Sequence, residues 1–241
     1  MKSGILAIVV SVAFAVTVRA ASETVDGITW NYSVNAGSAT ISKTVIAGDV
    51  VIPSSLGGYP VVGFDNSAFR DCKSLTSVII PYGVTSIGAQ AFYGCNALTS
   101  VSVPNSVTSI GSAAFEACSA IKDISLPSSV TSIGDSAFYM CRSLVNVNIP
   151  DKVNSIGDST FLGCSALSNI VIPGGITSIG SRAFESCESL ASVIMPSGMN
   201  IIGESAFYGC SGLTSITIPD GVMRIGASAF YGCSGLTKLS A

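Results

Sequence analysis

The sequence predicts an α/β solenoid of eight 23-residue coils, each with a short strand, a turn, a second short strand and a short helix. Three residue types recur with one common step of 23 residues, which unrelated side chains would not share by chance. Phenylalanines run from Phe69 to Phe230, cysteines from Cys72 to Cys233 and prolines from Pro81 to Pro219. One coil of this length cannot bury its own apolar side chains, so stacking against neighbouring coils must supply the core.

The first twenty residues have the pattern of a secretory signal peptide. Lys2 precedes an apolar run of 15 residues, and Val18-Arg19-Ala20 places small residues at −3 and −1 before a polar stretch. A membrane anchor is the alternative, but crossing the hydrocarbon takes about 20 apolar residues. For residues 1–20 we therefore expect a signal peptide cut after Ala20, with a cut after Ala21 as the alternative. The protein would then be secreted or on the cell surface, with no membrane span after signal removal.

Residues 21–60 lie outside the period and predict an N-terminal β-rich cap. Residues 29–34 alternate in the manner of a strand, and residues 38–42 and 50–52 are two further candidates, separated by turns that contain glycine. A repeat array needs a terminal unit with a polar outer face, which is the role expected for this segment. The solenoid is then expected to occupy residues 61–241.

Within one coil, the first strand and its end can be read directly from the residues. Val78 and Ile80 point to the same side because side chains alternate along a strand, and Leu75 leads into it. Pro81 closes this strand because proline cannot donate to the next rung of a ladder. Val84 and Ile87 then form a second apolar pair, for which we expect the second short strand.

The segment after the next glycine predicts the short helix of each coil. Asp135 lies where an N-cap oxygen would accept hydrogen bonds from free backbone N–H groups, as do Ser112, Asp158 and Ser181. Ala137, Phe138 and Cys141 would then share one helical face. The constant offset of phenylalanine from proline and cysteine also predicts that the phenylalanines stack in register inside the array.

The pattern L-x-x-V-x-I-P-x-x-V-x-x-I-G-x-x-A-F-x-x-C resembles the BspA-like class of leucine-rich repeats over residues 61–241. It departs from the more familiar leucine-rich pattern, in which Asn or Cys precedes the next leucine. The resemblance implies an extracellular protein, often an adhesin or a binder of host or matrix proteins. Its implications concern architecture more than the identity of a ligand.

Composition and motif content argue against catalysis, cofactors, metals and nucleic acid. The formal charge is −3 and only 11 residues are basic, whereas phosphate contacts need clustered Lys and Arg. Histidine is absent, no G-x-S-x-G motif occurs, and the carboxylates form no defensible catalytic pair. Zinc sites show cysteines two to four residues apart, a spacing that this sequence lacks. We expect no enzyme, no cofactor, no metal site and no nucleic-acid partner.

The eight cysteines favour a stack of buried thiols that act as small apolar side chains. Neighbouring coils should lie about 4.8 Å apart, whereas a relaxed disulfide needs Cβ atoms about 3.8 Å apart. Disulfides remain the alternative because the expected compartment is oxidising.

The binding prediction concerns the outward side of the first strand in each coil. This side forms a polar, nearly uncharged stripe with an amide cluster at its centre, and its residues change from coil to coil. Its members are Ser77 and Ile79, Ser100 and Ser102, Asp123 and Ser125, Asn146 and Asn148, Asn169 and Val171, Ser192 and Ile194, and Ser215 and Thr217. We expect Asp123, Asn146, Asn148 and Asn169 to bind an extracellular protein or glycan. The alternative is a passive structural or spacer protein whose stripe contacts nothing specific.

The C-terminal segment predicts an uncovered edge. Residues 235–241 begin a ninth strand, and Tyr231, Leu236 and Leu239 would stand there with Lys238 as the only charge. Unpaired strand edges are templates for another chain. We therefore expect either end-to-end self-association through this edge or fraying of the last coil.

Overall fold

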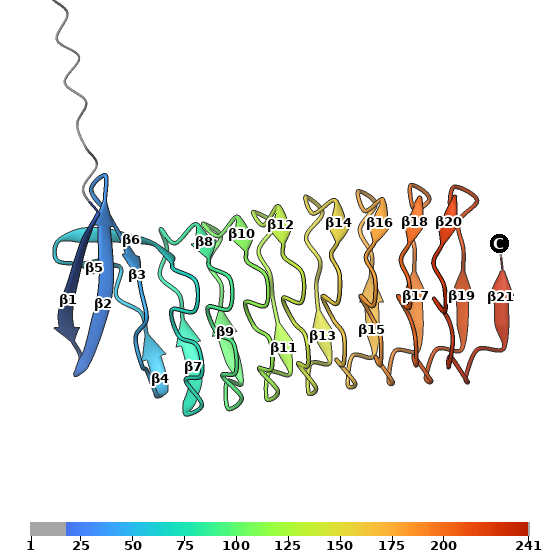
Figure 1. The fold of residues 1–241 in the computed structure, drawn as a ribbon, viewed down its shortest axis with the longest axis horizontal. Coiled ribbons are helices and arrows are strands. Elements are labelled where there is room, and N and C mark those ends of the chain that lie inside the picture. The colour runs from blue at the N-terminus through green and yellow to red at the C-terminus, as the bar shows by residue number, and fades with distance from the viewer. Residues whose placement is uncertain (1–17, 241) are drawn as a thin grey trace, which may run out of the picture.

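The protein is a β-solenoid of about eight turns, and this computed structural model describes residues 18–240. Figure 1 shows the coils following one another along one axis, with two rows of short strands. We call the first row the first strand face: β4 (Gly48–Val51), β7 (Leu75–Ile79), β9 (Ser100–Ser102), β11 (Asp123–Ile124), β13 (Asn146–Val147), β15 (Asn169–Val171), β17 (Ser192–Ile194), β19 (Ser215–Thr217) and β21 (Lys238–Ser240). The second strand face contains β6 (Tyr59–Phe64), β8 (Ser86–Ile87), β10 (Ser109–Ile110), β12 (Ser132–Ile133), β14 (Ser155–Ile156), β16 (Ser178–Ile179), β18 (Ile201–Ile202) and β20 (Arg224–Ile225).

Three N-terminal strands continue the second strand face. β1 (Arg19–Val25) pairs antiparallel with β2 (Ile28–Asn35), which pairs antiparallel with β3 (Ser38–Ile41), and β3 pairs in parallel with β6. The short β5 (Ser55–Leu56) also pairs with β6. The strands expected near residues 29–34, 38–42 and 50–52 are therefore confirmed as β2, β3 and β4.

The N-terminal strands pack directly onto the first coil. Trp30 is buried, and its ring meets that of Phe69 edge-on with centroids 6.3 Å apart. Most of the predicted signal peptide, residues 1–17, lies outside the described residues, so its cleavage stays a prediction. Arg19 and Ala20 pair with Val34 and Ser33, so cleavage after Ala20 would leave the rest of β1 on its partner.

The alternating pattern of the first strand in each coil places its aliphatic side chains in the core. In β7, Leu75 and Val78 are buried while the neighbouring Ile79 is half exposed. Parallel pairing then aligns equivalent residues of successive coils, as in the pairing of Val78 with Val101. The core is consequently one continuous column of like side chains, which runs the length of the solenoid.

The predicted α/β class is wrong, because residues 18–240 form no helix. The segment that was expected to be helical is a series of turns, which we call the turn edge: residues 134–141 and their equivalents in the other coils. Ser136 and Met140 both have a φ of 58°, a left-handed conformation that a right-handed helix excludes. The burial expected of Ala137, Phe138 and Cys141 is nevertheless confirmed.

Hydrogen bonding shows what replaces the helix at the turn edge. The N–H groups of Ser136, Phe138 and Met140 donate to carbonyls of the next coil, while the residues between them donate three residues back. Asp135 caps no helix either, because its Oδ1 accepts a hydrogen bond from the backbone N–H of Asp158 (3.0 Å). The turn edge is therefore a ladder between coils, and every second residue supplies a rung.

The spacing between coils explains why a helix is excluded there. Strands on two sides of each coil set the repeat at about 4.8 Å, whereas a helix with its side chains is about 10 Å across. Helices could fit only if the coils fanned apart on that side. The phenylalanine rings instead stack 5.0–5.6 Å apart along the whole turn edge, which confirms the predicted phenylalanine column.

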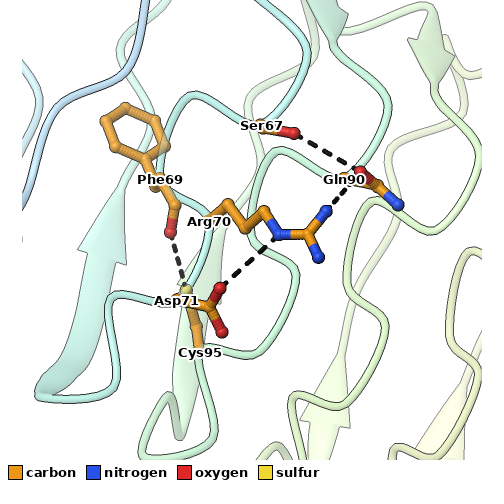
Figure 2. A network of polar contacts seen from close by, with 6 residues as sticks. All are labelled: Ser67, Phe69, Arg70, Asp71, Gln90 and Cys95. Atoms are coloured by element: carbon orange, nitrogen blue, oxygen red, sulfur yellow. Dashed lines mark hydrogen bonds and ion pairs between the residues drawn. The ribbon is translucent and has the colours of Figure 1, made fainter.

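The cysteines form a second column beside the phenylalanines. All eight are free, and those from Cys72 to Cys210 are buried. The Cys95 Sγ–H donates to the carbonyl oxygen of Phe69 at 3.2 Å (Figure 2). Equivalent bonds of 3.1–3.2 Å join every later cysteine to the phenylalanine 26 residues earlier. The thiol is thus a hydrogen-bond donor across the coil junction as well as a small core side chain.

Polar side chains on the surface of the first turns add contacts between coils. Arg70 donates to Gln90 Oε1 at 2.7 Å and lies 3.5 Å from the Asp71 carboxylate, while Ser67 also donates to Gln90 (Figure 2). Gly134 supports the same close stacking, because a Cβ there would overlap the backbone nitrogen of Ser112 in the preceding coil.

The two strand faces, unlike the turn edge, are interrupted. The first strand face divides into the sheets β4-β7-β9, β11-β13 and β15-β17-β19-β21, and the second divides between β12 and β14. Within residues 18–240, no junction has both faces open, because β11 pairs with β13 where β12 and β14 are unpaired, β10 pairs with β12 where β9 and β11 are unpaired, and β14 pairs with β16 where β13 and β15 are unpaired. The hydrogen bonds of the turn edge continue across all three junctions.

Candidate functional site

The first strand face carries a depression of about 490 Å³ where its ladder is interrupted. It extends over β11, β13 and β15, near the middle of the solenoid in Figure 1. The floor is aliphatic and largely buried, and includes Ile124, Val147 and Ile170. The polar lining residues are Asp123, Ser125, Asn146, Asn148, Asp151 and Asn169.

Asp123 and Asn146 form a hydrogen-bonded pair on one side of the depression. They are opposite each other in the parallel register of β11 and β13, and both side chains point outward. The Asn146 Nδ2 group donates to Asp123 Oδ1 at 2.7 Å. This bond orients the carboxylate and leaves its second oxygen available to a donor from outside.

Asn148 has a structural role that its outward position on the strand did not predict. Its Oδ1 accepts from the backbone N–H of Leu126 (2.8 Å), and its Nδ2 donates to the Leu126 carbonyl (2.7 Å). At the equivalent place in the first coils, the backbone N–H of Ile80 donates to the backbone carbonyl of Ser102. The amide side chain of Asn148 thus takes the place of a backbone rung between the two chain segments.

The opposite side of the depression combines one amide with exposed aliphatic groups. Asn169 begins β15 and donates to Ser168 Oγ at 3.3 Å. Val171 ends the same strand and is 67% exposed, and its register partner Ile194 in β17 is 66% exposed. This side therefore offers a hydrocarbon strip beside the polar groups, which a ligand could cover.

The structure brings all four predicted binding residues, Asp123, Asn146, Asn148 and Asn169, into one depression. Asp151 was missed, because its place after the strand-ending proline marked it only as a turn residue. Asp151 directly follows Pro150, four residues beyond the end of β13, so its closeness in sequence to the outward strand residues would have indicated it.

The depression is suited to reversible binding. Its polar side chains are three amides and one hydroxyl, which donate and accept hydrogen bonds, and two carboxylates, which accept them. Within residues 18–240 no group of three or more Cys, Asp or Glu side chains is arranged to hold a metal ion.

A second hollow of about 490 Å³ lies on the turn edge, where Tyr139, Arg142 and Arg182 are among the lining residues. Arg182 donates to Glu185 at 2.7 Å, and this hydrogen bond raises the pKa of the guanidinium. The charge of Arg182 is therefore already matched by Glu185 within this hollow.

Comparison with known proteins places the repeat in a described group. A family model for the BspA type leucine rich repeat region matches residues 62–190 and 155–241, with six copies. A solved leucine-rich repeat protein from Bacteroides ovatus is 30% identical, with a TM-score of 0.62, over 90% of this chain and 70% of that chain. A leucine rich cell surface protein from Faecalibacterium prausnitzii is 25% identical, with a TM-score of 0.50, over 91% of this chain and 94% of that chain.

Two further findings bear on function. A comparison with curated proteins finds no match. Among residues 18–240, no helix has the length and apolar character needed to cross a membrane.

Proposed function

This chain belongs to the BspA-type leucine-rich repeat family, and we propose that it is a binding or adhesion module that presents its first strand face to an extracellular protein or glycan. The proposal includes export through the signal peptide at residues 1–20. One solved relative is described as a cell surface protein, which supports an extracellular site of action. A non-catalytic role is part of the same proposal.

The depression on the first strand face is the observation that carries this proposal. At the first outward position of the strand, Ser77, Ser100, Ser192 and Ser215 are serines, whereas the depression has Asp123, Asn146 and Asn169 there. Amide and carboxylate groups at the rim of an aliphatic hollow are typical of a surface that orients a ligand by hydrogen bonds.

A passive spacer is the second candidate, and the uniform chemistry of the turn edge favours it. A spacer needs only a stable column, which the phenylalanine and cysteine stacks supply. A break in the strand ladder gives a spacer no advantage, because the lost hydrogen bonds weaken the array without a compensating contact.

A binding screen separates the two candidates. Protein expressed from the full sequence would be tested by surface plasmon resonance against panels of extracellular-matrix proteins and of glycans. We expect a ligand whose affinity falls about tenfold, or about 1.4 kcal/mol, in the variant Asn146→Ala/Asn169→Ala.

The matched control is Ser192→Ala/Ser215→Ala, which alters the same outward row outside the depression. This control should leave the affinity unchanged. A ligand that binds wild type and both variants equally would place the site elsewhere, and the absence of any ligand in both panels would favour the spacer.

A further inference from the structure

The charge of the depression restricts what it can bind. Two of its lining residues, Asp123 and Asp151, carry carboxylates, and none of its lining residues is Lys or Arg. Both aspartates are exposed, and neither forms an ion pair within residues 18–240. A bound group with a positive charge would therefore meet two carboxylates that no ion pair neutralises.

The apolar strip restricts the ligand further. Val171 and Ile194 face outward side by side in the register of β15 and β17, and both are about two-thirds exposed. Aliphatic side chains that cover this strip would be removed from water, which favours binding. The same ligand must thus carry hydrocarbon close to its positive charge.

We propose that the depression binds an extended segment of a partner protein in which Lys or Arg lies next to an aliphatic residue. This inference rests on the proposed function and names the ligand class. The cation pairs with Asp123 and Asp151, the aliphatic residue covers Val171 and Ile194, and the amides of Asn146 and Asn169 bond to the peptide backbone. A peptide fits better than a glycan because the depression has no aromatic residue on which a sugar ring would stack.

The test uses two labelled 12-residue peptides in a Gly-Ser background, one with a central Val-Lys-Val and the other with Val-Glu-Val. Fluorescence anisotropy with the full chain should show binding of the lysine peptide and at least tenfold weaker binding of the glutamate peptide. The affinity for the lysine peptide should also decrease when the salt concentration is raised from 0.05 M to 0.5 M, because added ions screen exposed charges.

The decisive variant is Asp123→Asn/Asp151→Asn, which removes both charges while keeping side-chain shape. We expect it to weaken binding of the lysine peptide at least tenfold. The matched control is Asp49→Asn/Asp220→Asn, because Asp49 pairs with Ser77 on the first strand face and Asp220 has the turn position of Asp151 in a later coil. Both control residues are exposed and outside the depression, so this variant should bind as wild type does.

The outcomes separate this inference from the proposed function. Equal binding of the two peptides, or no effect of Asp123→Asn/Asp151→Asn, overturns the inference. If no peptide binds but a glycan binds in a manner that depends on Asn146 and Asn169, the inference fails and the proposed function stands. If neither panel nor peptide yields a ligand, both fail.

Discussion

The turn edge and the first strand face are built from the same 23-residue unit but differ in continuity. Along the turn edge, each coil repeats the hydrogen bonds of the previous one, and the rings of Phe115, Phe138 and Phe161 stay within 3–4° of parallel. On the first strand face, the ladder divides into three sheets, and the outward residues change from coil to coil.

The difference shows which part of the repeat has freedom to vary. The turn edge joins neighbouring coils wherever one strand face is open, and the other strand face stays paired there, so the first strand face can lose rungs without separating the coils. A depression with its own polar residues can therefore form on one face of an otherwise uniform column. The predictions that follow test this division of roles.

The largest effect should come from breaking the phenylalanine column. Phe138 is fully buried between Phe115 and Phe161. Phe138→Ala should lower the free energy of unfolding by about 3–5 kcal/mol, because it leaves a cavity in a packed core. Urea unfolding followed by circular dichroism measures this. A loss below about 1 kcal/mol would show that the turn edge does not hold the coils together.

The cysteine column should make the protein less stable at alkaline pH. Burial raises the pKa of Cys141 to about 12, whereas an exposed thiol has a pKa of about 8.5. Below pH 8.5 the neutral thiol makes its full contribution to the free energy of unfolding. This contribution is lost as the pH rises from 8.5 toward 12, because only the unfolded chain releases the thiol proton in that range.

The measurement compares wild type with Cys141→Ala between pH 7 and pH 10. The unfolding free energy of wild type should fall by about 2 kcal/mol more than that of the variant over this range. The comparison cancels the titration of tyrosines and lysines, which both proteins share. Parallel pH profiles would mean that this thiol ionises equally in the folded protein.

A smaller effect is expected where an amide side chain takes the place of a backbone rung on the first strand face. Asn148→Ala removes both side-chain hydrogen bonds to Leu126 and should cost about 1–2 kcal/mol of stability. Hydrogen exchange should then speed up at the Leu126 amide while the turn-edge amides of the same coils keep their protection. Uniform loss of protection over the whole coil would contradict the separation of the two regions.

The smallest effect on stability is expected at the rim of the depression. Asn146→Ala and Asn169→Ala should each change the free energy of unfolding by less than about 0.5 kcal/mol, because both side chains are exposed and outside the core. Thermal unfolding next to the control Ser192→Ala checks this. A loss as large as that of Asn148→Ala would make these residues structural rather than binding residues.

The sequence by itself determined the period and the direction of the side chains. Alternation along the first strand placed Val78 in the core and Ile79 outside, and the fixed step of 23 residues aligned every phenylalanine and cysteine. The same alternation assigned Asp123, Asn146, Asn148 and Asn169 to one outward face, where the structure has them around one depression. These features depend on local geometry, which can be read from the order of residue types along the chain.

Only the tertiary structure decided what depends on the distance between coils. The turn edge has left-handed residues in place of a helix because its repeat must match the spacing of the strands beside it. The Cys95 thiol bonds to Phe69, and Asn148 bonds to Leu126, each across a coil junction. Such partners lie more than twenty residues apart in the chain, and they meet only because stacked coils bring backbone groups of one turn within reach of side chains of the next.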